Sequence, residues 1–175
     1  MTSSSGGDEP TMSIPQGDLR LLSTEIAKRL LSSTIPARLG YIALDGTPRV
    51  VPTWHVWTGE ELVMATFVRC PPLGITRPAR RLAALEAHPA VAVTIDTAAE
   101  PPDVLLLRGR VSVTRVDGMV PEQAEAARRF LGEQGGREYV EHADHPETIM
   151  ARIALIPDWA GVLDFRTRAP SIIGG

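Results

Sequence analysis

The chain has 175 residues, of which 43% are hydrophobic and 22% are charged, a composition typical of one globular domain. Its formal net charge of −3 argues against a nucleic-acid-binding protein, because such domains carry a basic surface. No apolar run in the sequence is long enough to span a membrane, so we expect no membrane partner. Cys70 is the one cysteine and cannot form an internal disulfide, which favours a cytoplasmic location.

Residues 1–18 are rich in Ser, Gly, Pro and acidic side chains, a composition that predicts a disordered N-terminal tail. This stretch also lacks the basic and apolar regions of a secretory signal, so we expect none. Leucine and isoleucine then recur at a helical spacing, which predicts a helix over residues 19–31. We expect one domain over residues 19–175.

The next part of the chain has the residue types and turn signals of β-strands. Asp45-Gly46 is a strong hairpin signal, and Thr58-Gly59 marks a second tight turn. We expect the three strands that these turns separate to pair as an antiparallel meander. These strands are predicted over residues 37–44, 49–57 and 61–67.

The second half of the chain predicts two main helices and four strands. The helices are expected over residues 77–87 and 121–133, with Gly135-Gly136 ending the second and a further helical turn over 138–143. Gly109 predicts a bend in the second of the four strands. The strands are expected over residues 90–96, 104–116, 148–156 and 161–166. The fold class is therefore mainly β (α+β), a closed antiparallel barrel of about six to seven strands with flanking helices.

Residues 50–57 are the first segment that could carry function. Strand alternation puts Pro52 and Trp54 on one face and Thr53 and His55 on the other. A proline fits an edge strand or a bulge, where free backbone groups could bond the polar edge of a planar ring. Taken alone, the segment favours the simpler interpretation, in which Pro52 marks a bulge and the tryptophans pack in the core.

A second segment lacks acidic residues from position 62 to position 85 but contains four arginines. Thr76 is a suitable N-cap for a helix that starts near Arg77, with Pro78 in its first turn. Basic side chains at a helix start oppose the helix dipole unless an anion compensates, so this segment could bind a phosphate. A solvated basic surface is the alternative. The arginines are Arg69, Arg77, Arg80 and Arg81.

The remaining candidates predict no catalytic side-chain set. The histidines lack the spacing of metal ligands, so we expect no metal site, and no nucleophile elbow accompanies His142 and Asp144. Cys70 is interpreted as an inert loop residue. Arg108 and Arg110 share one strand face, and we expect them to face solvent or a partner. If the protein is an enzyme, a bound cofactor would supply the chemistry.

Residues 37–54 resemble the opening of the pyridoxamine 5′-phosphate oxidase-like superfamily. The run reads as a small residue followed by Arg-Leu, a strand, Asp-Gly-x-Pro, and a second strand that ends in Pro-x-Trp. Three later stretches resemble the third strand, the phosphate-binding helix and the following strand of that family, and a fourth resembles its closing strand. They cover residues 62–66, 76–82, 88–93 and 157–165.

The resemblance implies a split-barrel homodimer with FMN, or a 5-deazaflavin coenzyme, bound at two equivalent sites in the dimer interface. By position, three residues of the second strand would line the ring, one residue would approach the ribityl chain, and four would serve the phosphate. Pro78 stands where the family often has a lysine, His55 replaces a usual aromatic residue, and Trp159 is placed at the mouth of the interface. The cofactor-binding residues are Pro52, Thr53 and Trp54; Thr66; and Thr76, Arg77, Arg80 and Arg81.

Three functional hypotheses follow, in order of preference. The first is a flavin- or deazaflavin-dependent oxidoreductase that acts on a small-molecule substrate, with no residue assigned as catalytic. The second is a non-catalytic protein that binds or senses a flavin or haem, with His55 as the feature that favours haem. The third is a structural dimer whose barrel recognises a partner protein.

Overall fold

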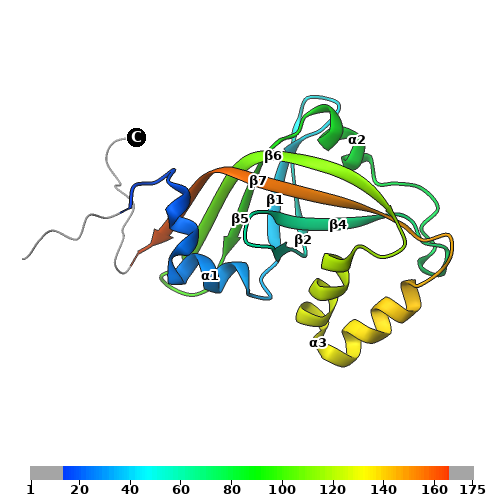
Figure 1. Cartoon of the computed structure of the whole chain (residues 1–175). Helices are drawn as coiled ribbons and strands as arrows, with labels where there is room; N and C mark the ends of the chain where they lie inside the picture. The colour runs from blue at the N-terminus through cyan, green and yellow to red at the C-terminus, as the bar shows by residue number, and fades with distance from the viewer. Residues whose placement is uncertain (1–13, 166–175) are drawn as a thin grey trace, which may run out of the picture.

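The computed structural model describes residues 14–165 and shows one curved antiparallel sheet with helices around it (Figure 1). Its strands are β1 Ala37–Ile42, β2 Pro48–Thr53, β3 Val56–Trp57, β4 Leu62–Arg69, β5 Ala90–Asp96, β6 Asp103–Asp117 and β7 Ile149–Asp164. Its α-helices are α1 Glu25–Leu31, α2 Arg80–Ala87 and α3 Pro121–Ala143, and its 3-10 helices are Leu19–Ser23 and Pro71–Leu73. The predicted mainly β class, with seven strands, is confirmed.

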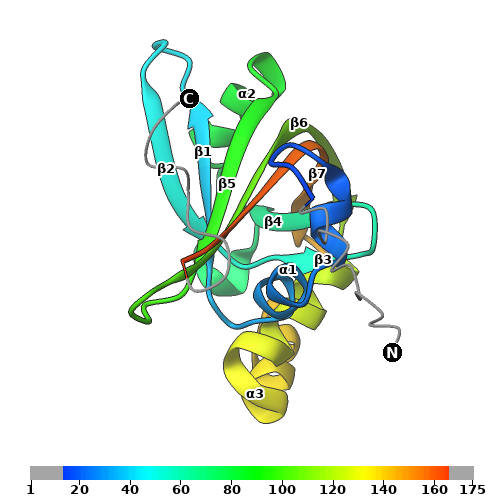
Figure 2. The same cartoon turned by 90° about the vertical axis from the view of Figure 1, so that its left-hand side faces the viewer.

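The strand order is β2-β1-β5-β6-β7-β4-β3, so the sheet curls round and leaves β2 and β3 as its two edges. Figure 2 shows β2, β1 and β5 on one side and β7, β4 and β3 on the other. The long strands β6 and β7 run across the molecule and join the two sides. This arrangement is the split barrel that the sequence predicts.

Alternating side chains of the central strands fill the barrel. In β5 the buried positions are Val91, Val93 and Ile95, one residue in two, as the pleat of a strand requires. They pack in the same core as Leu105 and Leu107 of β6. The ladder between β6 and β7 shifts register between Arg108 and Gly109, where the sequence predicts a bend, and the bulge itself lies opposite Gly109 in β7.

The predicted three-stranded meander has both of its expected pairings, but its middle strand, predicted over residues 49–57, is broken in two. β2 pairs with β1 and β3 pairs with β4, and the break between them falls at Trp54 and His55. Both of these side chains make contacts away from the sheet, since Trp54 stacks on Phe130 of α3 and His55 bonds the carbonyl of Leu31, the last residue of α1. These tertiary contacts carry the chain from one edge of the sheet to the other.

The predicted start of α2 is also wrong. The helix begins at Arg80, its N-cap is Ala79 in an extended conformation, and no side chain caps it, so Thr76 is not the cap. Pro78 explains the delay, because a residue that precedes proline is disfavoured in the helical region and Arg77 therefore cannot open the helix. The segment between β4 and α2 forms a 3-10 turn and a bridge between Cys70 and Ile75 instead of a plain loop.

Helix α3 is longer than expected and is kinked. Gly132, with φ of 80°, breaks the helical geometry, whereas the predicted terminator Gly135-Gly136 lies inside the second part. A Cβ on Gly136 would lie 2.4 Å from the Cα of Arg128, so this glycine allows the two parts of α3 to pack closely. The predicted ending at Gly135-Gly136 is wrong because these glycines serve packing and not termination.

Two further elements differ in extent. Thr24 caps α1 and separates it from the preceding 3-10 helix, so the predicted helix over residues 19–31 is two short helices. The two expected final strands are one continuous strand, β7, because Trp159 and Pro157 stay in the ladder opposite Arg108 and Gly109. Asp158 of β7 is the extra residue of the bulge, so the parts of β7 before and after it both stay paired with β6.

The helices close different parts of the barrel. Helix α2 packs on β1 and β6, α3 packs on β3 and β4, and α1 lies against β5, β6 and β7. Within residues 14–165, none of the helices combines the length and apolarity needed to cross a membrane.

Candidate functional site

Strand β2 forms one free edge of the sheet, and a pocket lies at each of its ends. Arg49 and Thr53 of β2 lie opposite Tyr41 and Ala37 of β1, which places both on the face that looks into the fold. Val51 lies between them on the same face and packs against the core. Four residues of extended strand span about 13 Å, so the two pockets are separated by the length of a small extended ligand.

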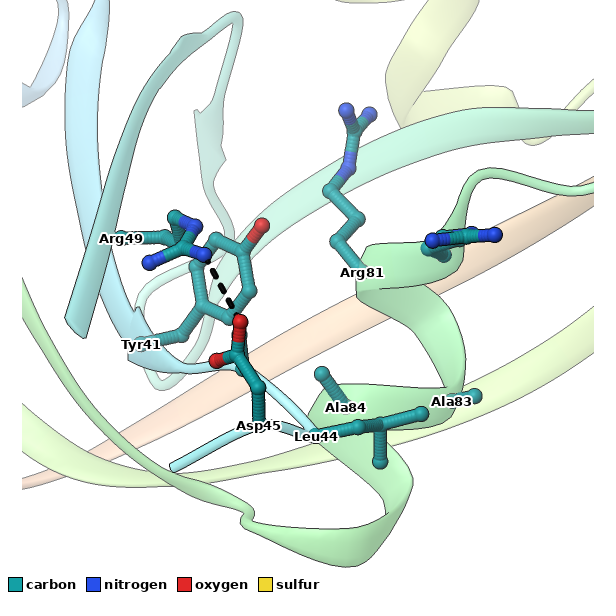
Figure 3. A pocket seen from close by; sticks show the side chains of 9 residues that line it. Tyr41, Leu44, Asp45, Arg49, Arg81, Ala83 and Ala84 are labelled. Atoms are coloured by element: carbon teal, nitrogen blue, oxygen red, sulfur yellow. Dashed lines mark hydrogen bonds and ion pairs between the residues drawn. The ribbon is translucent and has the colours of Figure 1, made fainter. Parts of the chain in front are cut away.

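The first pocket, named here the arginine pocket, has a volume of about 460 Å³ and lies between the β1–β2 hairpin and α2. Tyr41, Asp45 and Arg49 line it from the hairpin side, and Arg80 and Arg81 line it from the first turn of α2. Figure 3 shows Arg81 rising from α2, across the pocket from Tyr41 and Arg49. Three arginines and one carboxylate, that of Asp45, therefore line this pocket.

The charges of this pocket are unevenly paired. Arg49 forms an ion pair with Asp45 at 3.0 Å, and hydrogen bonds from Thr47, with the Arg49 charge, keep the pKa of Asp45 below its usual value. Arg80 and Arg81 form no ion pair with any carboxylate of residues 14–165. The excess positive charge therefore belongs to these two residues.

Arg81 is the more informative of the two because it is half-buried. Burial lowers the pKa of its guanidinium, and the nearby Tyr41 only partly opposes this effect. The first-turn N–H groups of α2 receive no side-chain cap, and the positive end of the helix dipole adds to the same region. A half-buried cation beside an uncapped helix start favours an anionic group as its partner.

The second pocket, named here the uncharged pocket, has a volume of about 430 Å³ and lies where β2 ends, facing α3. Pro52, Thr53 and Trp54 form one wall, and Gln123 and Tyr139 of α3 form the other. No side chain that lines it carries a charge at neutral pH. Its lining is completed by Pro36 and Ala65.

Aromatic side chains hold the wall at Trp54. Its ring stacks on Phe130 with centroids 5.4 Å apart and planes 19° apart, and Tyr139 meets it edge-on at 5.6 Å. Phe67 of β4 lies 6.3 Å from the Tyr139 ring. The cluster fixes Trp54 against α3. Its position is compatible with both sequence-based interpretations, namely that Trp54 packs inside the fold and that it lines a ligand site.

His55 follows Trp54 in the chain, lies 6.0 Å from the Phe130 ring and is 1% exposed. Its Nε2 lies 3.2 Å from the Leu31 carbonyl oxygen, and the Arg129 guanidinium donates to the carbonyl oxygens of both Leu31 and His55. Burial, followed by the charge of Arg129, lowers the pKa of His55 from 6.5 to about 4. His55 is therefore a neutral structural residue that joins α1, α3 and the end of β2.

The structure brings five of the eight predicted cofactor-binding residues to the two pockets. Pro52, Thr53 and Trp54 line the uncharged pocket, and Arg80 and Arg81 line the arginine pocket. The other three line neither pocket. They are Thr66, which follows Ala65 on β4 and so points to the opposite face of that strand, and Thr76 and Arg77, which are exposed before α2.

Several lining residues were missed at the sequence level. Arg49 and Tyr41 could have been found from the hairpin, because the Asp45-Gly46 turn places them opposite each other on adjacent strands. Gln123 and Tyr139 could not, since nothing local in the sequence shows which strands α3 packs on. Arg69 is one of the four arginines of the acid-poor segment. It forms an ion pair with Glu147 at 2.7 Å, so it does not contribute to the arginine pocket.

The weaker candidates lie apart from both pockets. Cys70 is fully buried, as expected of an inert residue, and its sulfur lies within 4 Å of the Ala143 carbonyl oxygen and the Thr148 hydroxyl. Among residues 14–165, no group of His, Cys, Asp or Glu side chains is arranged to hold a metal ion. Arg108 and Arg110 are exposed on β6, and Arg108 lies 4.2 Å above the Trp159 ring.

The sequence matches no protein-family model and no curated protein. Its structure is similar to that of an F420 reductase, with a TM-score of 0.55 and 24% identity over 75% of this chain and 93% of the other. It is also similar to a protein of Clostridium acetobutylicum related to general stress protein 26, of the pyridoxinephosphate oxidase family, with a TM-score of 0.51 and 12% identity over 82% and 86% of the two chains.

A third similar structure is a haem-binding protein of Mycobacterium smegmatis, with a TM-score of 0.50 and 16% identity over 79% of this chain and 52% of the other. At these identities the likenesses concern the fold. They confirm, at that level, the resemblance found in residues 37–54 and in the later stretches. The chain has the split-barrel fold of the pyridoxamine 5′-phosphate oxidase-like proteins.

Proposed function

We propose that the protein binds FMN or a 5-deazaflavin coenzyme along β2 and acts as an oxidoreductase on a small-molecule substrate. The observation that carries the proposal is Arg81, a half-buried cation without a carboxylate partner among residues 14–165, beside the uncapped start of α2. A cofactor phosphate would compensate this charge. The fold shared with an F420 reductase supports the same class of ligand.

Different residues along β2 would bind different parts of the cofactor. Arg81 and Arg80 would hold the phosphate, and the face of β2 that carries Val51 would lie along the ribityl chain. Thr53 and Trp54 would contact the ring, while the edge of β2 that no strand covers in residues 14–165 offers backbone groups to the ring's polar side. When bound, the flavin-type ring supplies hydride or electron transfer, and the protein supplies orientation and hydrogen bonds.

We also propose a cytoplasmic homodimer with the site at its interface. The outer face of the β1–β2 hairpin supports an interface, because Val50 is 70% exposed and Ile42 is 38% exposed. Thr66, Thr76 and Arg77 line neither pocket of one chain, and they would join the site where a second copy extends it. Trp159, half-buried under Arg108, stays a candidate for the mouth of such an interface.

The haem alternative is less well supported by the geometry. A haem-binding protein shares the fold, but the Nε2 of His55 bonds the Leu31 carbonyl, and its Nδ1, which has no partner, is buried and faces neither pocket. A ligand to haem iron needs a free ring nitrogen that faces a cavity. A non-catalytic flavin-binding protein is the second candidate, because no side chain in either pocket is a nucleophile paired with a base.

Titration of the purified protein with FMN and with the deazaflavin coenzyme, followed by turnover with the reduced form, tests the proposal. We expect saturable binding of at least one cofactor and oxidation of the reduced cofactor when an acceptor is added. Binding without turnover would favour the non-catalytic candidate. No binding of either cofactor would contradict the proposed function.

A further inference from the structure

We propose that Gln123 and Tyr139 form a substrate-binding wall in the uncharged pocket, selective for uncharged aromatic compounds that carry a carbonyl group. This inference deepens the proposed function, on which its catalytic meaning rests, by naming a substrate class for the same site. The two residues come from α3, on the opposite side of the pocket from Thr53 and Trp54. With cofactor bound, a planar substrate would lie between α3 and the cofactor ring that contacts Thr53 and Trp54. Without cofactor, a planar ligand would lie between α3 and β2 themselves.

The lining of the pocket offers no opposite charge to a charged ligand. The walls offer one amide, two hydroxyl groups, an indole and small apolar side chains, and none is ionised at neutral pH. A carboxylate or phosphate that entered would lose solvation without gaining an opposite charge, which is costly. The arginine pocket is the contrasting case, so anions and uncharged groups should bind at opposite ends of β2.

The hydrogen-bonding capacity of the wall points to a carbonyl group. The Gln123 amide nitrogen lies 3.0 Å from the Tyr139 hydroxyl oxygen, and Gln123 is 8% exposed. In this arrangement the Tyr139 O–H proton remains available to a ligand. If the amide were turned over, the Tyr139 hydroxyl would donate to Gln123 and the amide N–H groups would remain available instead. Either orientation leaves the pair with a donor for an acceptor oxygen.

The state of Tyr139 supports its role as a donor. Burial raises the pKa of its hydroxyl, so the group keeps its proton at neutral pH. Its ring is held by Trp54 and Phe67, at centroid distances of 5.6 and 6.3 Å, which fixes where the hydroxyl points. The pocket volume of about 430 Å³ lies within the range of small-molecule sites. The small Pro36, Pro52 and Ala65 side chains leave this space open for a flat ring.

Three naphthalenes of similar size test the inference by calorimetric titration of the protein without added cofactor. They are 2-acetylnaphthalene with a carbonyl, 2-ethylnaphthalene without an acceptor, and 2-naphthoate with a charge. One neutral hydrogen bond predicts that the acetyl compound binds about threefold to tenfold more tightly than the ethyl compound. The naphthoate should bind most weakly of the three.

Tyr139→Phe removes the hydroxyl and keeps the ring, so it should abolish the preference for the acetyl over the ethyl compound. Tyr41→Phe makes the same change in the arginine pocket and should leave the preference intact. Should Tyr139→Phe fail to fold in thermal unfolding, Gln123→Met is the second variant, with the acetyl preference expected to fall about threefold.

The inference is overturned if the wild type shows no acetyl preference, if it binds naphthoate best or binds none of the three compounds, or if Tyr139→Phe keeps the preference. Because these titrations need no cofactor, their outcome is separate from that of the proposed function. A protein that discriminates the naphthalenes but binds neither FMN nor the deazaflavin would keep the substrate wall and lose the cofactor assignment.

Discussion

The two pockets at the ends of β2 differ in charge. The arginine pocket leaves cations without carboxylate partners among residues 14–165, which costs stability unless an anion arrives. The uncharged pocket has no unpaired charge, and its walls are held by the Gln123–Tyr139 hydrogen bond and the stacking of Trp54 on Phe130. The difference indicates that the first end is built around a ligand's charge and the second around its shape.

Charge reversal at Arg81 should have the largest effect on ligand binding, because it removes the cation on which the arginine pocket depends. Arg81→Glu removes a charged hydrogen bond and places a negative charge beside the phosphate, so we expect FMN affinity to fall by about 3 kcal/mol or more. Calorimetric titration measures the loss. Arg137→Glu is the matched control, because Arg137 is exposed on α3 and lines neither pocket, so its reversal should change affinity far less. Equal losses in the two variants would show that only general surface charge matters.

Low pH should lower the stability of the protein through His55, which is buried next to Trp54 of the uncharged pocket. The pKa of His55 is lowered from 6.5 to about 4, so between these values the unfolded chain binds a proton that the folded chain does not. Stability from this group is therefore complete above about pH 6.5 and falls as the pH drops, by about 2.5 kcal/mol at about pH 4.5.

Denaturant unfolding of wild type and His55→Gln over this pH range measures the contribution of His55. Glutamine can still donate to the Leu31 carbonyl but does not titrate. On acidification to about pH 4.5 the free energy of unfolding of the variant should therefore fall by about 2.5 kcal/mol less than that of the wild type. Parallel pH profiles for the two proteins would mean that His55 titrates normally and that its burial does not govern its charge.

Truncation of Phe130 sharpens the comparison at the uncharged end. Phe130→Leu removes the ring stacked on Trp54 and should lower the free energy of unfolding by about 1–2 kcal/mol. Binding of riboflavin, which has the ring and no phosphate, should weaken, while binding of inorganic phosphate should not change. Weakened phosphate binding would show that the two pockets are not independent.

Salt should produce the smallest effect and separate the two ends without mutation. Added sodium chloride screens the exposed Arg80 and the half-buried Arg81, so FMN affinity should fall by about 0.5–1 kcal/mol from low to high salt. Riboflavin affinity should stay nearly constant, because no charged side chain lines the uncharged pocket. Equal salt dependence for the two ligands would contradict this division.

The local patterns of the sequence predicted most of the fold. Alternation in residues 90–96 and the Asp45-Gly46 turn gave correct strands, because burial on one face and turn geometry are encoded within a few residues. The errors came where distant contacts decide. Trp54 and His55 leave the sheet for α3 and α1, and Pro78 moves the start of α2 past Thr76.

The candidate site divides in the same way. Its charged residues and its Pro-x-Trp wall lie in two short segments that can be read directly, at positions 52–54 and 80–81. Its second wall, Gln123 and Tyr139, is brought in by a helix about seventy residues further along, whose packing against β3 and β4 depends on the whole barrel. The kink at Gly132 sets the direction of its second half, which carries Tyr139.

The central claim is that Arg81 binds the phosphate of a cofactor. Four binding affinities test it most directly. They are those of wild type and Arg81→Ala for FMN and for riboflavin, which lacks the phosphate. We predict that wild type binds FMN more tightly than riboflavin, and that Arg81→Ala weakens FMN by about 1.5–3 kcal/mol while leaving riboflavin unchanged. Equal binding of FMN and riboflavin by wild type, or equal losses for both ligands in Arg81→Ala, would contradict the claim.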